Sequence, residues 1–396
     1  MSPTKLPYFA ENEMLTEDIL DFCRSNILSN IVGVTQETDI QYSIRDAEDF
    51  DAGVSLSFSP RKYKIHINAG LANDLYSSIN RTNKKQKIAL CNQCKGVEEF
   101  FNWNRLSMFL YTSSVVFVVM HEIGHVVAGH VDYFSKLRHK YGLNFSALNE
   151  IRNTSLAEAE LKNLPHDAIE LALFRLLNDK KCDEGKYIKL KEIEADGFAV
   201  DLILKFRHTL VTLFVQDSML IDNIESGKID TEDDNGVAKL IFFSILQCIL
   251  QFERLQELDE GDTSRAFYQA RLLYACLSYV LIMCPDCVLY DSQTNTISAV
   301  ETKKEELKLF ILKQLLPVLI WTQRLAEKLG IRISLVPVVK RDSFRGNKFL
   351  FNDIVSIVFG QSNVNSLGAK ELSNIGLDIA SWYSDLRRYR RSEVVI

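Results

Sequence analysis

Residues 115–132, VVFVVMHEIGHVVAGHVD, decide how this chain is organised. They contain the pattern HExxH, and the six residues before it are all apolar. Such an apolar run predicts a helix that is buried on all sides, and we expect its N-cap among residues 112–114, which are Thr, Ser and Ser. On a helix, positions four apart lie within about 40° of each other, so His121 and His125 point the same way.

Two imidazoles and the carboxylate of Glu122 are costly to bury in an apolar helix unless a partner satisfies them. A Zn²⁺ ion is such a partner, because neutral imidazoles bind it and the glutamate can take a proton from a zinc-activated water. A chance match is the alternative reading, since HExxH constrains only three residues. The apolar setting speaks against a solvated surface helix and favours the metal site.

A zinc site of this kind needs a third ligand. In a metzincin, Gly and His follow the second histidine at three and six residues, but Ala128 and Val131 occupy those positions, which excludes that class. His130 lies five residues after His125, about 140° around a continuous helix. We therefore expect His130 to face away from the site.

A second polar segment, KEIEADGFA, lies on a helix predicted at about 188–206. Glu192 and Asp196 share one otherwise apolar face of this helix. Glu192 can supply the third ligand, and Asp196 can accept the outer N–H of a ligand histidine. The alternative is a solvated acidic face, because we expect the neighbouring Glu194 and Asp201 to be exposed.

At these residues the chain resembles the gluzincin metallopeptidases, which pair an HExxH helix with an ExxxD helix. HEIGHVVAGH followed by EIEADGFA looks most like the M48-type branch, and the phage-exclusion proteases are a second candidate. The resemblance implies an endopeptidase that acts on a protein or peptide. It implies one Zn²⁺ per chain, held by His121, His125 and Glu192, with Glu122 as general base. It also implies a small sheet whose edge strand binds the substrate backbone.

Gluzincins use a further His, Tyr or Arg to stabilise the oxyanion of the tetrahedral intermediate. Four residues around the second motif are candidates, and the sequence does not choose among them: Tyr187, His166, Arg207 and His208.

Composition limits the other readings. The chain has 396 residues, 47% of them hydrophobic, and a net charge of −6. This is enough for a large core, and no basic footprint for nucleic acid is present. The N-terminus lacks the apolar region of a secretory signal, so we expect a cytoplasmic protein with eight reduced cysteines. The longest apolar stretches, 240–250 and 272–284, are shorter than the roughly 20 residues a bilayer requires, so no membrane span is expected.

We expect an α+β fold that is mainly α, with a gluzincin-like catalytic lobe and a C-terminal helical lobe. The alternating residues of 51–69 predict a β-hairpin, and a short helix is expected at 70–80. An acidic linker at 221–236 separates the two lobes. The predicted domains are an N-terminal segment at 1–50, a zinc metallopeptidase domain at 51–222 and a helical domain at 237–396. Within the last, helices are predicted at 237–258, 264–283 and 301–328 and a strand at 332–339.

The helical lobe is about as large as the catalytic one. The main alternative is therefore a regulatory or latent gluzincin-like protein that binds a partner or signal with little turnover. A membrane-bound peptidase is the other alternative. The sequence indicates neither the substrate nor the oligomeric state.

Overall fold

A computed structural model of the chain describes residues 16–27, 40–56, 62–81, 103–131, 184–212, 231–256, 262–291, 296–331, 333–336, 349–360 and 368–373. In these residues the protein is mainly helical with two small sheets, as the α+β, mainly α prediction requires. Among the predicted features, His166 and the first part of the acidic linker lie outside the described residues.

The first sheet has three strands in the order β1-β3-β2, namely β1 (Ile40–Arg45), β2 (Ala52–Leu56) and β3 (Tyr63–Asn68). Strands β2 and β3 pair antiparallel, which confirms the predicted hairpin. Strand β1 pairs parallel to β3 and was not predicted. The alternation in β3 places Tyr63, Ile65 and Ile67 in the core, and the sheet packs against the HExxH helix.

The HExxH helix, α5 (Trp103–Val127), is longer than predicted. Residues 112–114 lie in its interior and do not cap it, so the predicted N-cap is wrong. Ser114 Oγ donates to the carbonyl of Leu110, 3.0 Å away in the preceding turn. The helix extends upstream because Leu106 and Phe109 continue its buried surface. The predicted short helix after the hairpin is confirmed as α2 (Ala69–Arg81) and packs on α5.

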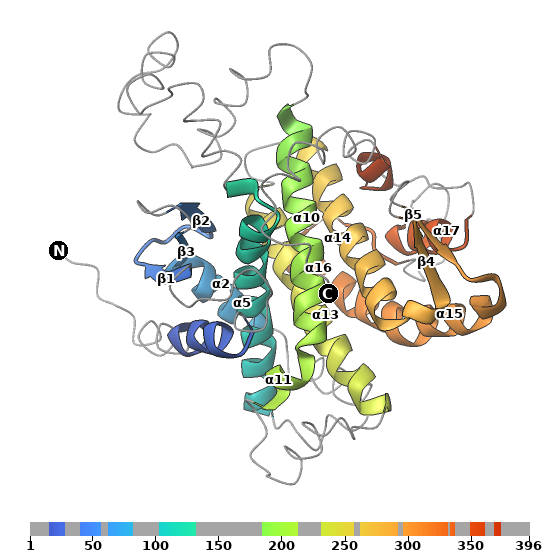
Figure 1. Ribbon diagram of the computed structural model, residues 1–396, viewed down its shortest axis with the longest axis horizontal. Coiled ribbons are helices and arrows are strands. Elements are labelled where there is room, and N and C mark those ends of the chain that lie inside the picture. Colours follow the sequence, from blue (N-terminus) through green and yellow to red (C-terminus); the bar gives the residue numbers. More distant parts are fainter. Residues whose placement is uncertain are drawn as a thin grey trace.

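The second motif helix, α10 (Glu184–Lys205), lies directly beside α5. A Cβ atom added at Gly124 of α5 would lie 3.1 Å from the Cα of Ala195 on α10, so the glycine permits near-backbone contact between the helices. Helices α13 (Thr231–Gln256) and α14 (Asp262–Met283) pack against this pair. Figure 1 shows the sheet on one side of α5, with α10 and α14 on the other.

The helices predicted in the C-terminal half are confirmed, with two corrections. Helix α13 begins at Thr231, so the end of the predicted linker is helical. Residues 333–336 are not a strand. An unpredicted antiparallel pair of strands occurs instead at 288–291 and 296–299. The remaining elements are η1 (Cys23–Ile27), α11 (Arg207–Thr212), η3 (Pro285–Cys287), β4 (Val288–Asp291), β5 (Thr296–Ala299), η4 (Glu301–Lys303), α15 (Lys304–Phe310), η5 (Ile311–Leu315), α16 (Leu316–Leu329) and α17 (Leu350–Val358).

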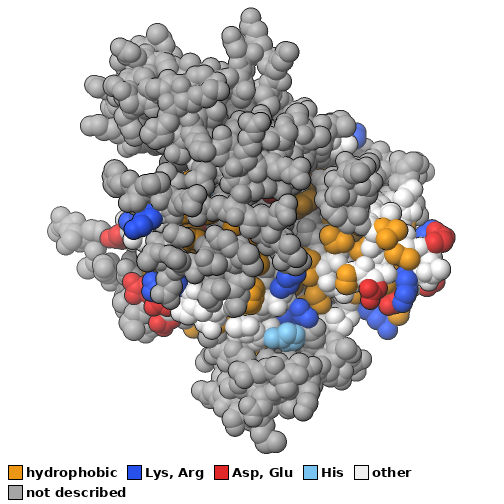
Figure 2. All heavy atoms as spheres, in the orientation of Figure 1, with side chains coloured by type: hydrophobic (Ala, Val, Ile, Leu, Met, Phe, Trp, Pro, Cys, Tyr) orange, Lys and Arg blue, Asp and Glu red, His pale blue; other side chains and the backbone are white. Residues whose placement is uncertain are grey.

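Four helical stretches of the described chain are long and apolar enough to cross a membrane by length and composition. The windows in α5 and α13 are 94% and 89% buried inside the protein, so core packing accounts for their apolar surface. Leu289, Leu309 and Leu312 are exposed, and Figure 2 shows hydrophobic side chains on the side where α15, β4 and β5 lie. These helical stretches are longer than the apolar stretches 240–250 and 272–284 from which no membrane span was expected. Their length therefore does not exclude a span, and the absence of one stays a prediction.

Candidate metal centre

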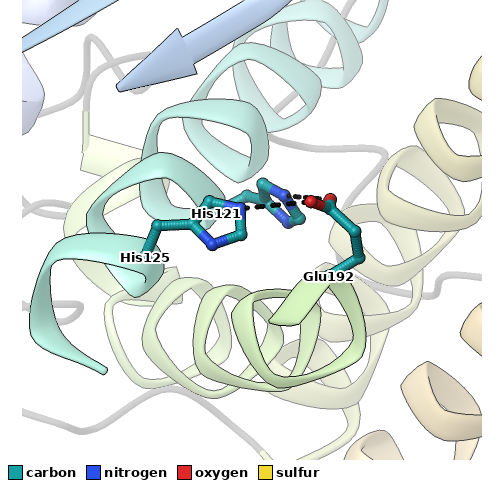
Figure 3. A group of neighbouring side chains, drawn as sticks. All are labelled: His121, His125 and Glu192. Carbon is teal, nitrogen blue, oxygen red and sulfur yellow. Dashed lines mark hydrogen bonds and ion pairs between the residues drawn. The ribbon is translucent and has the colours of Figure 1, made fainter. Parts of the chain in front are cut away.

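The centre is built by two side chains from α5 and one from α10. His121 and His125 stand one turn apart on α5, and Figure 3 shows both imidazoles extending toward the Glu192 carboxylate of α10. His121 Nε2 lies 3.0 Å from Glu192 Oε2, and His125 Nε2 lies 3.5 Å from Glu192 Oε1. The three ligand atoms of this group lie within 4.8 Å of one another.

The two distances from the histidines to Glu192 are close to those between ligands of a metal ion. Tetrahedral zinc with ligand bonds of about 2.0–2.1 Å places its ligand atoms about 3.3 Å apart. Both histidines are 7% exposed, whereas 20% of the Glu192 side chain is exposed. The two histidines are therefore buried, and the carboxylate is the most exposed of the three ligands.

The Nδ1 nitrogen of His121, which does not face Glu192, contacts Asp196, and Asp196 in turn is bound by Arg271. We call Asp196 and Arg271 the inner support. His121 Nδ1 lies 2.9 Å from Asp196 Oδ1, the kind of contact that the motif spacing predicted. Arg271, on α14, donates from Nε to Asp196 Oδ2 at 2.6 Å and from Nη2 to Oδ1 at 2.8 Å. Its guanidinium is surrounded by the aromatic rings of Phe252, Phe267 and Tyr268.

The outer nitrogen of His125 is held by a second pair, the outer support, His130 and Glu194. The expectation that His130 faces elsewhere is wrong, because α5 ends at Val127 and Gly129, with φ 81°, turns the chain back. His130 Nδ1 lies 2.9 Å from His125 Nδ1, and His130 Nε2 lies 3.2 Å from Glu194 Oε2. Glu194 is consequently only partly exposed, not solvated as expected.

The electrostatics of the cluster favour a cation. Burial alone lowers the pKa of His121, but hydrogen bonds to Asp196 and Glu192 outweigh it and raise the pKa to about 10. Burial opposes ionisation of Glu192, yet the hydrogen bond with His121 and the positive charges of His121 and Lys191 hold its pKa well below the usual range. For His125, burial dominates and keeps its pKa well below the ordinary value, so this imidazole is neutral. His125 and Glu192 are thus in the forms that bind metal, whereas His121 must give up a proton to do so.

Glu122 follows His121 on α5 and is 6% exposed. Burial raises its pKa to about 8, and the charges of Glu192 and Asp51 add to this effect. A carboxyl group whose pKa lies near neutrality can both take and return a proton at physiological pH. Asp51 directly precedes β2, so the start of that strand lies near the centre.

Lys191 is a charged residue of the centre that the sequence reasoning missed. It is 7% exposed, and its Nζ lies 3.8 Å from Glu192 Oε1. Its charge also lowers the pKa of Glu122. The only signal in the sequence is a lysine beside the predicted ligand, and helical spacing does not say toward which group so long a side chain turns.

The four oxyanion candidates are not brought together by the described structure. Tyr187 lies in the first turn of α10, where its side chain is outside the described part. Arg207 donates from Nη1 to the carbonyl of Leu204 at the far end of α10, about 18 Å along the helix from Glu192. His208 follows Arg207 on α11.

Within the part of the chain that the structure describes, one group of three or more His, Cys, Asp or Glu side chains has metal-ligand spacing. It consists of His121, His125 and Glu192. Comparison of the chain with protein-family models, with curated proteins and with solved structures found no match. The function must therefore be argued from the site itself.

Proposed function

We propose that the protein is a zinc-dependent endopeptidase that hydrolyses peptide bonds of a protein or peptide. One observation carries the proposal: two imidazoles and a carboxylate from separate helices converge within 4.8 Å, beside the buried carboxyl group of Glu122. The resemblance of HEIGH and EIEAD to the gluzincin motifs supports the same reading.

His121, His125 and Glu192 would hold the ion. A donor set of two nitrogens and one oxygen suits zinc better than magnesium or calcium, which prefer all-oxygen sites. When bound, zinc lowers the pKa of water and polarises a carbonyl group. The inner and outer supports contact Nδ1 of His121 and His125, while Nε2 of each histidine faces Glu192.

Glu122 would move the proton. It accepts a proton from the attacking water and passes it to the leaving amine, for which a pKa of about 8 is well matched. Lys191 would stabilise the negative charge that develops on the carbonyl oxygen, because its buried ammonium group lies beside Glu192.

The substrate would bind as an added strand. Among the described strands, β2 pairs with β3 alone and lies at an edge of its sheet. Strand β2 packs against α5, and Asp51 before it influences Glu122. An extended peptide on this edge would pass close to the centre.

Glu122→Gln tests the chemistry. The amide keeps the size of the side chain but cannot accept a proton, so we expect bound zinc to be retained and cleavage to fall by about 10²–10⁴-fold. Protein termini in cells carrying wild type or the variant identify the substrate, and elemental analysis measures the zinc. Equal cleavage by both forms would remove Glu122 from the mechanism.

Glu192→Ala tests the ligand set. We expect it to lower bound zinc, whereas Asp201→Asn, which removes a carboxylate from the same helix about 13 Å away, should bind as wild type does. Full zinc occupancy in Glu192→Ala would contradict the assignment.

A latent, regulatory protein is the second candidate. Arg271 favours it, because α14 supports His121 through Asp196 and a change in α14 would reach the centre. In that case zinc binds normally, but the comparison of termini shows no difference between wild type and Glu122→Gln.

A further inference from the structure

The chain after α5 returns to the metal centre through a single tight turn. The amide of Gly129 donates to the carbonyl of Val126 at 3.1 Å, and Gly129 has φ 81°. Glycine adopts this left-handed conformation at little cost and commonly ends helices in this way. The turn buries His130 to 2% exposure and places its ring next to that of His125, with the ring centroids 5.1 Å apart.

The contact between these two imidazoles has a direction. His125 Nδ1 and His130 Nδ1 are 2.9 Å apart, so one must carry the hydrogen and the other must accept it. His130 Nε2 faces Glu194 Oε2 at 3.2 Å, and an ionised carboxylate only accepts. His130 therefore donates from Nε2 and, in its neutral form, accepts at Nδ1. His125 must then donate from Nδ1, which leaves the lone pair of its Nε2 facing Glu192.

We propose that His130 and Glu194 are positioning residues of the metal centre, which hold His125 with its Nε2 lone pair turned toward the cation. The inference rests on the zinc site proposed above. It gives a role to each acid of the motif EIEAD, because every one of them contacts a histidine side chain. Glu192 meets the two ligand nitrogens, Glu194 meets His130, and Asp196 meets His121.

The test is the zinc affinity of the purified full-length protein, measured by competition with a chelator. His130→Phe keeps an aromatic ring but removes both nitrogens, and we expect it to weaken zinc binding by about 10–100-fold. His130→Asn places an amide oxygen near the position of Nδ1 and should restore most of the loss. Glu194→Gln should weaken binding less than His130→Phe, because the amide oxygen still accepts from His130. Asp201→Asn is the matched control on α10 and should bind within about twofold of wild type.

A second readout separates positioning from a general loss of structure. NMR spectra of the zinc-loaded protein with ¹⁵N-labelled histidine should show the ring hydrogen of His125 on Nδ1. The signals of His125 and His130 are told apart by comparison with His130→Phe. If His130→Phe does not fold, Glu194→Gln carries the test, because its side chain is partly exposed.

The outcomes distinguish this inference from the proposed function. Wild type that binds no zinc overturns both. Wild-type affinity in His130→Phe and Glu194→Gln, or a hydrogen on Nε2 of His125, overturns the positioning role alone. Weakened binding in these variants, together with no peptide cleavage by the zinc-loaded wild type, supports the positioning role and overturns the endopeptidase.

Discussion

The inner and outer supports each contact Nδ1 of one ligand histidine, but they differ in the residues they use and in how deeply these are buried. Asp196 is fully buried, and Arg271 reaches it from α14, 75 residues further along the chain. The outer support uses a histidine only five residues from the ligand that it holds and a glutamate whose side chain is 18% exposed. One ligand histidine is thus held by a buried carboxylate of α10 and a buried guanidinium of α14, and the other by a histidine close to it in sequence and a partly exposed carboxylate of α10.

This difference separates stability from metal binding. A buried ion pair is costly to break, because removal of one partner leaves an uncompensated charge in the core. In the outer support, the carboxylate of Glu194 contacts a histidine and 18% of its side chain is exposed. We therefore expect the inner support to govern folding stability, and both supports to affect zinc affinity.

The largest expected effect is that of Arg271→Met. Asp196 would keep its contact with His121 but lose both hydrogen bonds from the guanidinium, so the free energy of unfolding should fall by about 3–5 kcal/mol. Denaturant unfolding of the metal-free protein measures this change. Glu194→Gln, in the outer support, should lose less than about 1 kcal/mol.

A double variant sharpens the same comparison. Asp196→Asn combined with Arg271→Met removes both charges, and its loss should be smaller than the sum of the two single losses. Equal losses in Arg271→Met and Glu194→Gln would contradict the division between the supports.

The second effect concerns the distance between α5 and α10, on which both supports depend. Gly124→Val should cost about 1–3 kcal/mol through overpacking, because even a Cβ at this position lies 3.1 Å from Ala195 Cα and 3.2 Å from Phe198 Cδ1. Zinc affinity should fall with it, since α5 carries the histidines and α10 carries Glu192. In Gly124→Ala, strain is offset by up to about 1 kcal/mol of helix propensity. A valine variant with wild-type stability and zinc affinity would show that this helix contact does not fix the centre.

Local periodicity explains what the sequence predicted. Helical spacing placed His121 and His125 on one face and Glu192 and Asp196 on another, and the structure brings these faces together. The hairpin, α2 and the long C-terminal helices follow from alternation or apolar runs in the same way.

The missed features depend on breaks or on distant contacts. His130 was misplaced because the rotation was counted on a continuous helix, although Gly129 before it is a common sign of a helix end. Arg271 in an apolar helix signals a buried partner, but no local pattern says that the partner is Asp196. Strand β1 was missed because parallel pairing with β3 is not encoded in either strand alone.

The smallest effect is expected at Lys191, which lies beside the third ligand. Its Nζ is 3.8 Å from Glu192 Oε1, so it lies within about 6 Å of a cation bound at the usual zinc–oxygen distance. At that separation the double charge of Zn²⁺ and the single charge of the ammonium group repel by roughly 1.4 kcal/mol even with the dielectric constant of water. Lys191→Met should therefore tighten zinc binding about tenfold, while turnover falls if the ammonium group stabilises the transition state; Lys191→Arg, which keeps the charge, is the control. Weaker zinc binding in Lys191→Met would mean that the lysine instead holds Glu192 in place, and the centre would then have a third support.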